Sequence, residues 1–147
     1  INSDKIDKHK VEEFRDSKNR LWIDARNAKN YDATINALVP YKDKNIHIII
    51  GGDDKGASLK PLFANIIELD IIIYALGSNT QRVLNYCEEF KISCVKCEYL
   101  EQAVKNIDKN LKENSIGILS PAAASLDQFK SYAHRGDEFK KFVKSLS

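Results

Sequence analysis

Residues 45–58, NIHIIIGGDDKGAS, decide the expected fold of this chain. Residues 46–50 are apolar and mostly β-branched, with His47 as the exception, and they are too few for a helix. They therefore predict a buried strand. Gly51 and Gly52 follow directly, and they allow the backbone to turn sharply where the strand leaves the sheet.

Three charged residues come directly after this turn: Asp53, Asp54 and Lys55. Ser58 is placed to cap a helix that begins near Leu59. A strand, a glycine turn, clustered charges and a helix, in this order, place binding groups at the carboxyl end of a central strand in open α/β sheets. The pattern is neither a Walker A motif nor GxGxxG, so by itself it also fits a solvated connection between strand and helix.

The rest of the chain alternates short apolar strands with amphipathic helices. A hairpin is expected over residues 11–24, and the helix after it would be capped by Asp32 and ended by Pro40. Further strands are expected over 70–76, 92–97 and 115–119, and helices over 59–67, 80–90, 100–111 and 137–146. This order predicts an α/β fold: a Rossmann-like open sheet, mainly parallel, with helices on both faces and an N-terminal antiparallel hairpin.

Length and composition fit one globular domain. At 147 residues, with 43% hydrophobic and 30% charged residues, the chain can bury a core. Its 23 basic and 21 acidic residues leave a net charge of +2, too balanced to argue for nucleic acid or an anionic membrane as partner. We expect no membrane span and no signal peptide. The chain contains no methionine, which fits a fragment of a longer protein.

The three cysteines are expected to be reduced. An odd number argues against a disulfide framework and suits the cytoplasm. Cys94 and Cys97 form a CxxC pattern, but on a strand this spacing points the two thiols to opposite faces. We therefore expect core residues rather than a metal or redox site.

Three polar loops should meet at one edge of the predicted sheet, because loops after parallel strands share an edge. They span residues 24–30, 51–58 and 120–135. Mixed charges that converge there suit a zwitterionic or carboxylate ligand, although pairing among surface charges remains open. The loops carry the basic Arg26, Lys29, Lys55 and Arg135, the acidic Asp24, Asp53, Asp54 and Asp127, and the hydroxyls of Ser125 and Tyr132.

No catalytic set can be assembled from the sequence. Ser125 has no evident histidine partner, and His134 is equally explained as a solvated residue at a helix end. The chain contains no HExxH, no P-loop and no Cys/His cluster of zinc spacing. In an ATP-using enzyme, the phosphate-binding and catalytic groups would lie outside this stretch.

Residues 119–139, LSPAAASLDQFKSYAHRGDEF, resemble the C-terminal signature of the Mur ligases. That signature is LSPA-x-AS-x-DQF, an aromatic residue near Tyr132, and RG-x-x-F. GGDDKG matches the family's GGD-x-K loop, and His9 and Lys10 fall where the family has His-Arg. The resemblance covers almost the whole chain, as the C-terminal domain (residues 1–147) of a three-domain enzyme. Residues 1–10 would be the linker from the central domain.

One loop departs from the family pattern, which is about DSKATN where this chain has DARNAKN. An ungapped alignment places Ala25, Asn27 and Lys29 at the family's Asp, Lys and Thr. An insertion at Asn27 instead keeps both charges, because Asp24 then matches the Asp and Arg26 the Lys. We prefer the second alignment, in which Lys29 still replaces the Thr.

The resemblance implies an ATP-dependent ligase of peptidoglycan synthesis that adds D-glutamate to UDP-N-acetylmuramoyl-L-alanine. The substrate carboxylate becomes an acyl phosphate, and the D-glutamate amine then forms the amide. ATP and Mg²⁺ would bind mainly to the central domain, so this stretch alone would be inactive, with no cofactor, metal ligand or catalytic residue. We expect a monomer.

The resemblance also assigns site residues. The D-glutamate contacts would be Lys55, Ser125, Tyr132 and Lys29. The nucleotide side would carry His9, Lys10, Asp24, Arg26 and Asp53. Two alternatives remain: a stand-alone α/β module that binds a small anion without catalysis, and a sister ligase for another amino acid, whose site would need an acidic partner for a distal amine.

Overall fold

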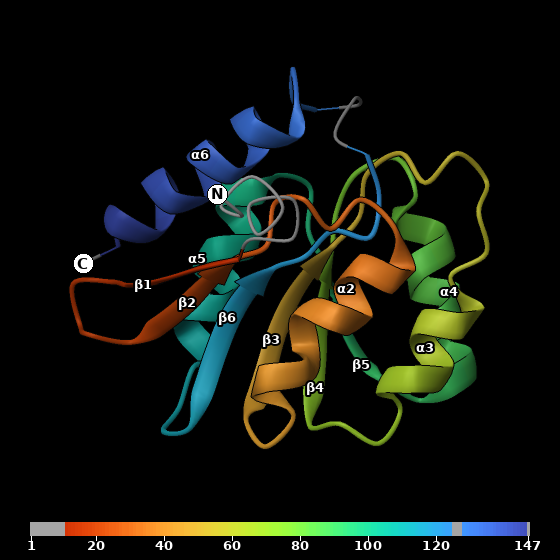
Figure 1. The fold of residues 1–147 in the computed structure, drawn as a ribbon, viewed down its shortest axis with the longest axis horizontal. Helices are drawn as coiled ribbons and strands as arrows, with labels where there is room; N and C mark the ends of the chain where they lie inside the picture. The colour runs from red at the N-terminus through yellow and green to blue at the C-terminus, as the bar shows by residue number, and fades with distance from the viewer. Residues whose placement is uncertain (1–10, 125–127, 147) are drawn as a thin grey trace, which may run out of the picture.

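The computed structural model describes residues 11–124 and 128–146. Its centre is a six-stranded sheet with the order β1-β2-β6-β3-β4-β5 (Figure 1). Only the β1–β2 pair is antiparallel, and every other neighbouring pair is parallel. The mainly parallel sheet and the N-terminal hairpin are therefore confirmed. The strands are β1 (Glu12–Arg15), β2 (Leu21–Asp24), β3 (Asn45–Ile50), β4 (Ile71–Ala75), β5 (Ser93–Lys96) and β6 (Ser115–Leu119).

Helices cover both faces of the sheet, as expected (Figure 1). One face carries α2, α3 and α4, and the other carries α5 and α6. The helical segments are α2 (Tyr31–Leu38), the short 3₁₀ helix η1 (Val39–Tyr41), α3 (Lys60–Ile66), α4 (Thr80–Phe90), α5 (Leu100–Asn110) and α6 (Tyr132–Lys144).

Strand β3 is buried on both sides. Ile48 and Ile50 belong to the core under α2–α4, whereas Ile49 belongs to the core under α5 and α6. Burial of each such side chain contributes about 1.5–3 kcal/mol. The run of isoleucines therefore fits a central parallel strand with both faces covered.

Strand β6 lies between β2 and β3. After β6 the chain crosses to the face of the sheet opposite to the one that the chain follows after β2 and β3. The chain after β2 and β3 enters α2 and α3 on one face, while the chain after β6 enters α6 on the other. Such a reversal opens a crevice at the carboxyl ends of the strands, the usual ligand position in open α/β sheets.

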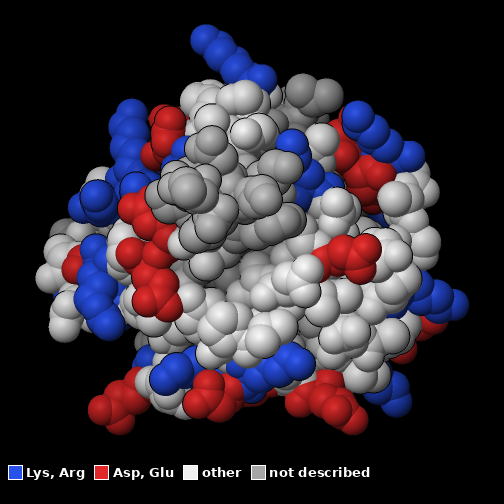
Figure 2. Space-filling model, in the orientation of Figure 1, with Lys and Arg blue, Asp and Glu red and all other residues white. Residues whose placement is uncertain are grey.

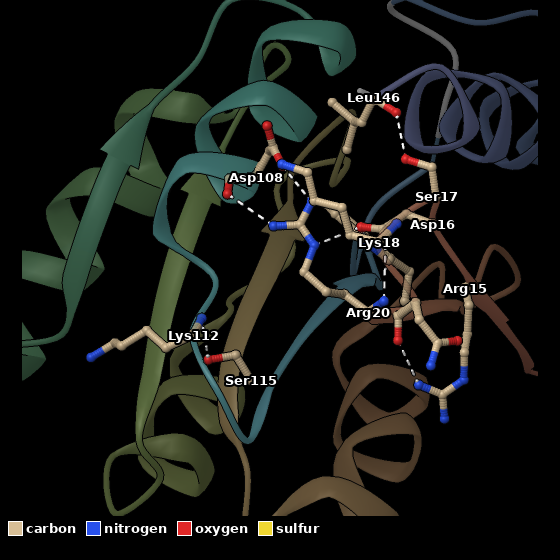
Figure 3. Close-up of polar contacts among 11 residues, drawn as sticks. Arg15, Asp16, Ser17, Lys18, Arg20, Asp108, Lys112, Ser115 and Leu146 are labelled. Carbon is tan, nitrogen blue, oxygen red and sulfur yellow. Dashed lines mark hydrogen bonds and ion pairs between the residues drawn. The ribbon is translucent and has the colours of Figure 1, made fainter.

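The hairpin turn is fixed by Asp16, as Figure 3 shows. Its carboxylate accepts hydrogen bonds from the backbone and guanidinium of Arg20 and from Trp22 Nε1. Arg20 also pairs with Asp108 of α5, and Ser17 Oγ donates to the carbonyl of Leu146, 2.9 Å away. The hairpin is thereby attached to α5 and to the segment that follows α6.

Two helix starts differ from expectation. Asn30, not Asp32, caps α2: its side chain accepts from the backbone N–H of Ala33 at 2.9 Å. Helix α6 begins at Tyr132 rather than Asp137, because Ser131 adopts an extended conformation and its Oγ accepts from the N–H of His134. Residues 132–135 therefore belong to a helix and not to the preceding loop.

Ser58 lies one residue before the N-cap of α3, which is Leu59. Its Oγ nevertheless accepts from the N–H of Lys60 at 3.2 Å. The expected hydroxyl contact at this helix start therefore exists, displaced by one residue.

The cysteines lie on both sides of the sheet. Cys87 and Cys94 belong with the core under α2–α4, whereas Cys97 packs with the core under α5 and α6. The prediction that Cys94 and Cys97 face opposite ways is confirmed. All three are free thiols. Within the described ranges, no helix combines the length and the apolar character needed to cross a membrane.

Candidate functional site

The three polar loops meet at the carboxyl edge of the sheet, as the sequence predicted. The segment after β6 lies in the middle: the N–H of Ala122 donates to the carbonyl of Ala28 at 2.8 Å. On its other side, Asp53 and Ala124 exchange two backbone hydrogen bonds of 2.9 Å and form an isolated antiparallel bridge. The three loops are therefore held by backbone contacts, which fix the positions of the side chains they carry.

Gly51 and Gly52 are required by close backbone approach. Their φ angles are +143° and +134°. A Cβ at Gly51 would lie 1.7 Å from the carbonyl oxygen of Leu76, and one at Gly52 would lie 2.3 Å from that of Ala124. Only glycine lets the loop after β3 pass between its two neighbours.

The carboxylate of Asp54 points toward α4. Its Oδ2 accepts from Asn79 Nδ2 at 3.0 Å and pairs with Arg82. Asn79 is 5% exposed, and its Oδ1 accepts from the N–H of Gly52 at 3.0 Å. The Asn79 amide therefore links the Gly52 backbone to the Asp54 carboxylate and stabilises the glycine turn.

Asn79 and Arg82 were missed by sequence reasoning. A signal exists for Asn79, because it follows Gly77 just after β4, at the same edge of the sheet. Arg82 carries no comparable signal, since a basic residue in a helix is usually a solvated one.

Lys55 lies at the exposed tip of the loop, and Asp53 lies partly buried at its base. Asp53 Oδ1 accepts from the backbone N–H of Lys55 at 3.0 Å. Lys55 has φ +54° and an exposed side chain, and its ammonium forms no ion pair with residues 11–124 or 128–146. The ammonium is therefore accessible to a ligand carboxylate at this edge.

Asp24 and Arg26 pair with each other. Asp24 is 2% exposed at the end of β2 and accepts from Arg26 Nε at 3.0 Å and Nη2 at 2.6 Å. Arg26 Nη1 donates to Asp137 Oδ1 at 2.8 Å. Burial opposes the charge of Arg26, but the hydrogen bonds to Asp24 and Asp137 outweigh it and hold the pKa of Arg26 above its ordinary value.

Lys29 and Tyr132 are brought together from distant parts of the chain. The ammonium of Lys29 lies 4.4 Å from the centroid of the Tyr132 ring, a cation–π contact. The Tyr132 ring is 39% exposed at the first residue of α6. A cation of the loop 24–30 and the aromatic ring at the start of α6 are therefore in contact.

Several predicted residues cannot be placed in this way. His9, Lys10, Ser125 and Asp127 lie outside the described residues, and so does the expected meeting of Lys55 with Ser125. Arg135 was expected on a loop, but it is buried at 2% exposure within α6. It is therefore part of the helix packing rather than an exposed cation.

On the face of the molecule that Figure 2 shows, basic and acidic side chains are interspersed rather than gathered into one patch. Among residues 11–124 and 128–146, no three His, Cys, Asp or Glu side chains gather into a potential metal site. Among the described residues, the edge carries the ammonium groups of Lys29 and Lys55, together with the buried carboxylate of Asp24 and the hydroxyl of Tyr132. This set suits a small carboxylate ligand.

Comparison with known proteins gives close relatives. The chain is 48% identical over 143 residues to a UDP-N-acetylmuramoylalanine--D-glutamate ligase of Helicobacter pylori strain HPAG1, and 47% identical over 146 residues to one of Campylobacter jejuni strain RM1221. These matches cover 97% and 99% of this chain but 34% and 36% of the relatives. The chain thus spans about a third of the length of these relatives. No family model matches.

Solved structures show the same fold at low identity. The UDP-N-acetylmuramate-alanine ligase of Thermotoga maritima matches with a TM-score of 0.56 at 15% identity, over 87% of this chain and 28% of that one. The folylpolyglutamate synthase of the same organism matches with 0.59 at 11% identity, over 90% and 29%. Sequence and fold agree, and the chain belongs to the Mur ligase family.

Proposed function

We propose that this chain is the C-terminal, D-glutamate-binding domain of an ATP-dependent ligase that adds D-glutamate to UDP-N-acetylmuramoyl-L-alanine. The observation that carries this proposal is the identity of 47–48% over 97–99% of the chain to two ligases of that name. The proposal is supported by the Lys29–Tyr132 contact and by the exposed Lys55 on a neighbouring loop, because a dicarboxylate needs more than one cationic or hydroxyl contact.

In this proposal, the chain binds and orients the amino acid. The exposed ammonium of Lys55 pairs with one carboxylate of D-glutamate, while Lys29 and Tyr132, together with Ser125, hold the side-chain carboxylate. Held at both ends, D-glutamate presents its amine to the acyl phosphate. Orientation of this kind lowers the entropy that must be lost on reaching the transition state.

The nucleotide side of the domain would carry His9, Lys10, Asp24, Arg26 and Asp53. ATP supplies the phosphoryl group that activates the substrate carboxylate, and Mg²⁺ assists that transfer. The described part of this chain contains no carboxylate cluster that fits a metal ion. In this proposal, Mg²⁺ and most ATP contacts belong to the remaining two thirds of a full-length ligase.

The test is the amino-acid requirement of the full-length protein. With ATP, Mg²⁺ and UDP-N-acetylmuramoyl-L-alanine present, we expect phosphate release that depends on D-glutamate and not on L-lysine or meso-diaminopimelate. Dependence on another amino acid would assign the chain to a sister ligase. If phosphate release depends on none of these three amino acids, the proposal is contradicted.

A further inference from the structure

A second contact lies beside the Lys29–Tyr132 pair and joins the same two segments, the loop 24–30 and α6. Arg26 makes four side-chain hydrogen bonds there. Nε and Nη2 donate to Asp24, and Nη1 donates to the carbonyl of Ala133 at 3.1 Å and to Asp137 Oδ1 at 2.8 Å. We call Asp24, Arg26 and Asp137, with the Ala133 carbonyl, the Arg26 joint.

A glycine in α6 makes room for the Arg26 side chain. Gly136 lies inside the helix, where glycine costs about 1 kcal/mol relative to alanine. A Cβ at this position would lie 2.3 Å from Arg26 Nε and 2.6 Å from its Cζ. The guanidinium therefore lies directly on the helix at a point that only glycine leaves open.

The joint sets the start of α6 relative to the loop. Ala133, which accepts from Arg26, directly follows Tyr132, and Lys29 is three residues beyond Arg26. The Lys29–Tyr132 contact is exposed and has a single ammonium, so it cannot by itself fix the two segments. In the Arg26 joint, two hydrogen bonds from Nη1 cross to α6, one of them to the carboxylate of Asp137, while the bonds to Asp24 hold the guanidinium within its own loop. Because it includes this charge-assisted pair, the joint is the stronger of the two contacts.

We propose that Arg26 and Asp137 are positioning residues for the amino-acid site: they hold Lys29 against Tyr132 so that both meet the side-chain carboxylate of D-glutamate. This inference rests on the proposed function. It gives Arg26 a role that its place on the nucleotide side does not explain. It also gives a role to Asp137, which lies in the second turn of α6.

The test uses Asp137 in the full-length ligase, because its carboxylate is 70% exposed and its removal spares the core. Asp137→Ala should raise the KM for D-glutamate at least fivefold and leave the KM for ATP within twofold. Asp137→Asn keeps an oxygen acceptor for Arg26 and should restore most of the affinity. Glu138→Ala, the same charge change on the next residue of α6, is the matched control and should leave both KM values within twofold.

A double mutant separates this inference from the proposed function. If Asp137 acts through Lys29, then Asp137→Ala should change the KM for D-glutamate less than twofold in a Lys29→Ala background. If the double mutant instead raises the KM for D-glutamate by the product of the two single-mutant factors, the positioning role is overturned. An unchanged KM for D-glutamate in Asp137→Ala alone would overturn it as well. If Lys29→Ala and Tyr132→Ala both leave the KM for D-glutamate unchanged, the proposed amino-acid site itself is wrong.

Discussion

At the scale of single residues, the backbone at Gly51 leaves no room for a side chain. We expect Gly51→Ala to lower the free energy of unfolding by about 3 kcal/mol or more, because its Cβ would overlap the carbonyl oxygen of Leu76 and φ is +143°. Gly56→Ala is the matched control: φ is +79°, but nothing lies within 4 Å of its Cβ, so the cost should be about 1 kcal/mol. Urea denaturation measures both, and equal losses would contradict the close packing of the glycine turn.

His47 is a buried, titratable residue within β3. It is 0% exposed, with Nε2 2.6 Å from Asn45 Oδ1 and Nδ1 2.9 Å from the Tyr74 hydroxyl. Burial, and then the charge of Lys112, lower the pKa of His47 below its ordinary value. The unfolded chain therefore binds more protons at this residue than the folded chain does.

This predicts a pH dependence of stability. The contribution of neutral His47 should be fully present above its unfolded pKa, about 6.5, and should be lost as the pH falls below that value. The slope should not exceed about 1.4 kcal/mol per pH unit. Urea denaturation between pH 7.5 and 5 measures it, and His47→Gln should flatten the curve. Identical slopes in parent and variant would show that His47 is not the responsible group.

Long-range side-chain pairs are the part of the site that the sequence could not predict. Arg26 and Asp137 are 111 positions apart, and Arg82 lies 28 positions from Asp54. Their pairing depends on which helix follows which strand, and it leaves no local periodicity. Sequence reasoning therefore named Arg26 and Asp54 but did not predict their long-range pairing with Asp137 and Arg82.

At the scale of elements, the two candidate caps of α2 can be separated by experiment. Asn30→Ala should cost about 1 kcal/mol of stability, because it removes the acceptor for the N–H of Ala33. Asp32→Ala should cost less than half of that, because Asp32 contributes only through the helix dipole in the first turn. A larger loss for Asp32→Ala, by thermal or urea unfolding, would restore Asp32 as the cap.

Strands and long helices were predictable because burial imposes a period on them. The isoleucines of β3 and the apolar stripe of α5 sit where the patterns placed them. The start of α6 was not predictable in this way. Its first residues, YAHRG, carry no apolar stripe and include Gly136, which is present because Arg26 lies against it.

At the scale of the whole molecule, the sheet has a core on each face, both built from residues of this chain. We therefore expect the 147-residue chain to fold alone and to unfold cooperatively. We also expect it to form no amide from ATP, D-glutamate and UDP-N-acetylmuramoyl-L-alanine, because it has no P-loop. Circular dichroism and a product assay test the two statements, and ATP-dependent product from this chain alone would contradict the second.

The most direct test of D-glutamate binding at this edge is the kinetics of Lys55→Ala in the full-length ligase. Loss of a charge-assisted contact costs roughly 1.5–3 kcal/mol, so the KM for D-glutamate should rise on the order of ten- to a hundredfold. Lys60→Ala, at the start of α3, is the control and should change little. Circular dichroism should show that both variants are folded. A KM for D-glutamate within twofold of the parent in Lys55→Ala would show that Lys55 is an ordinary surface lysine and would contradict the proposed site.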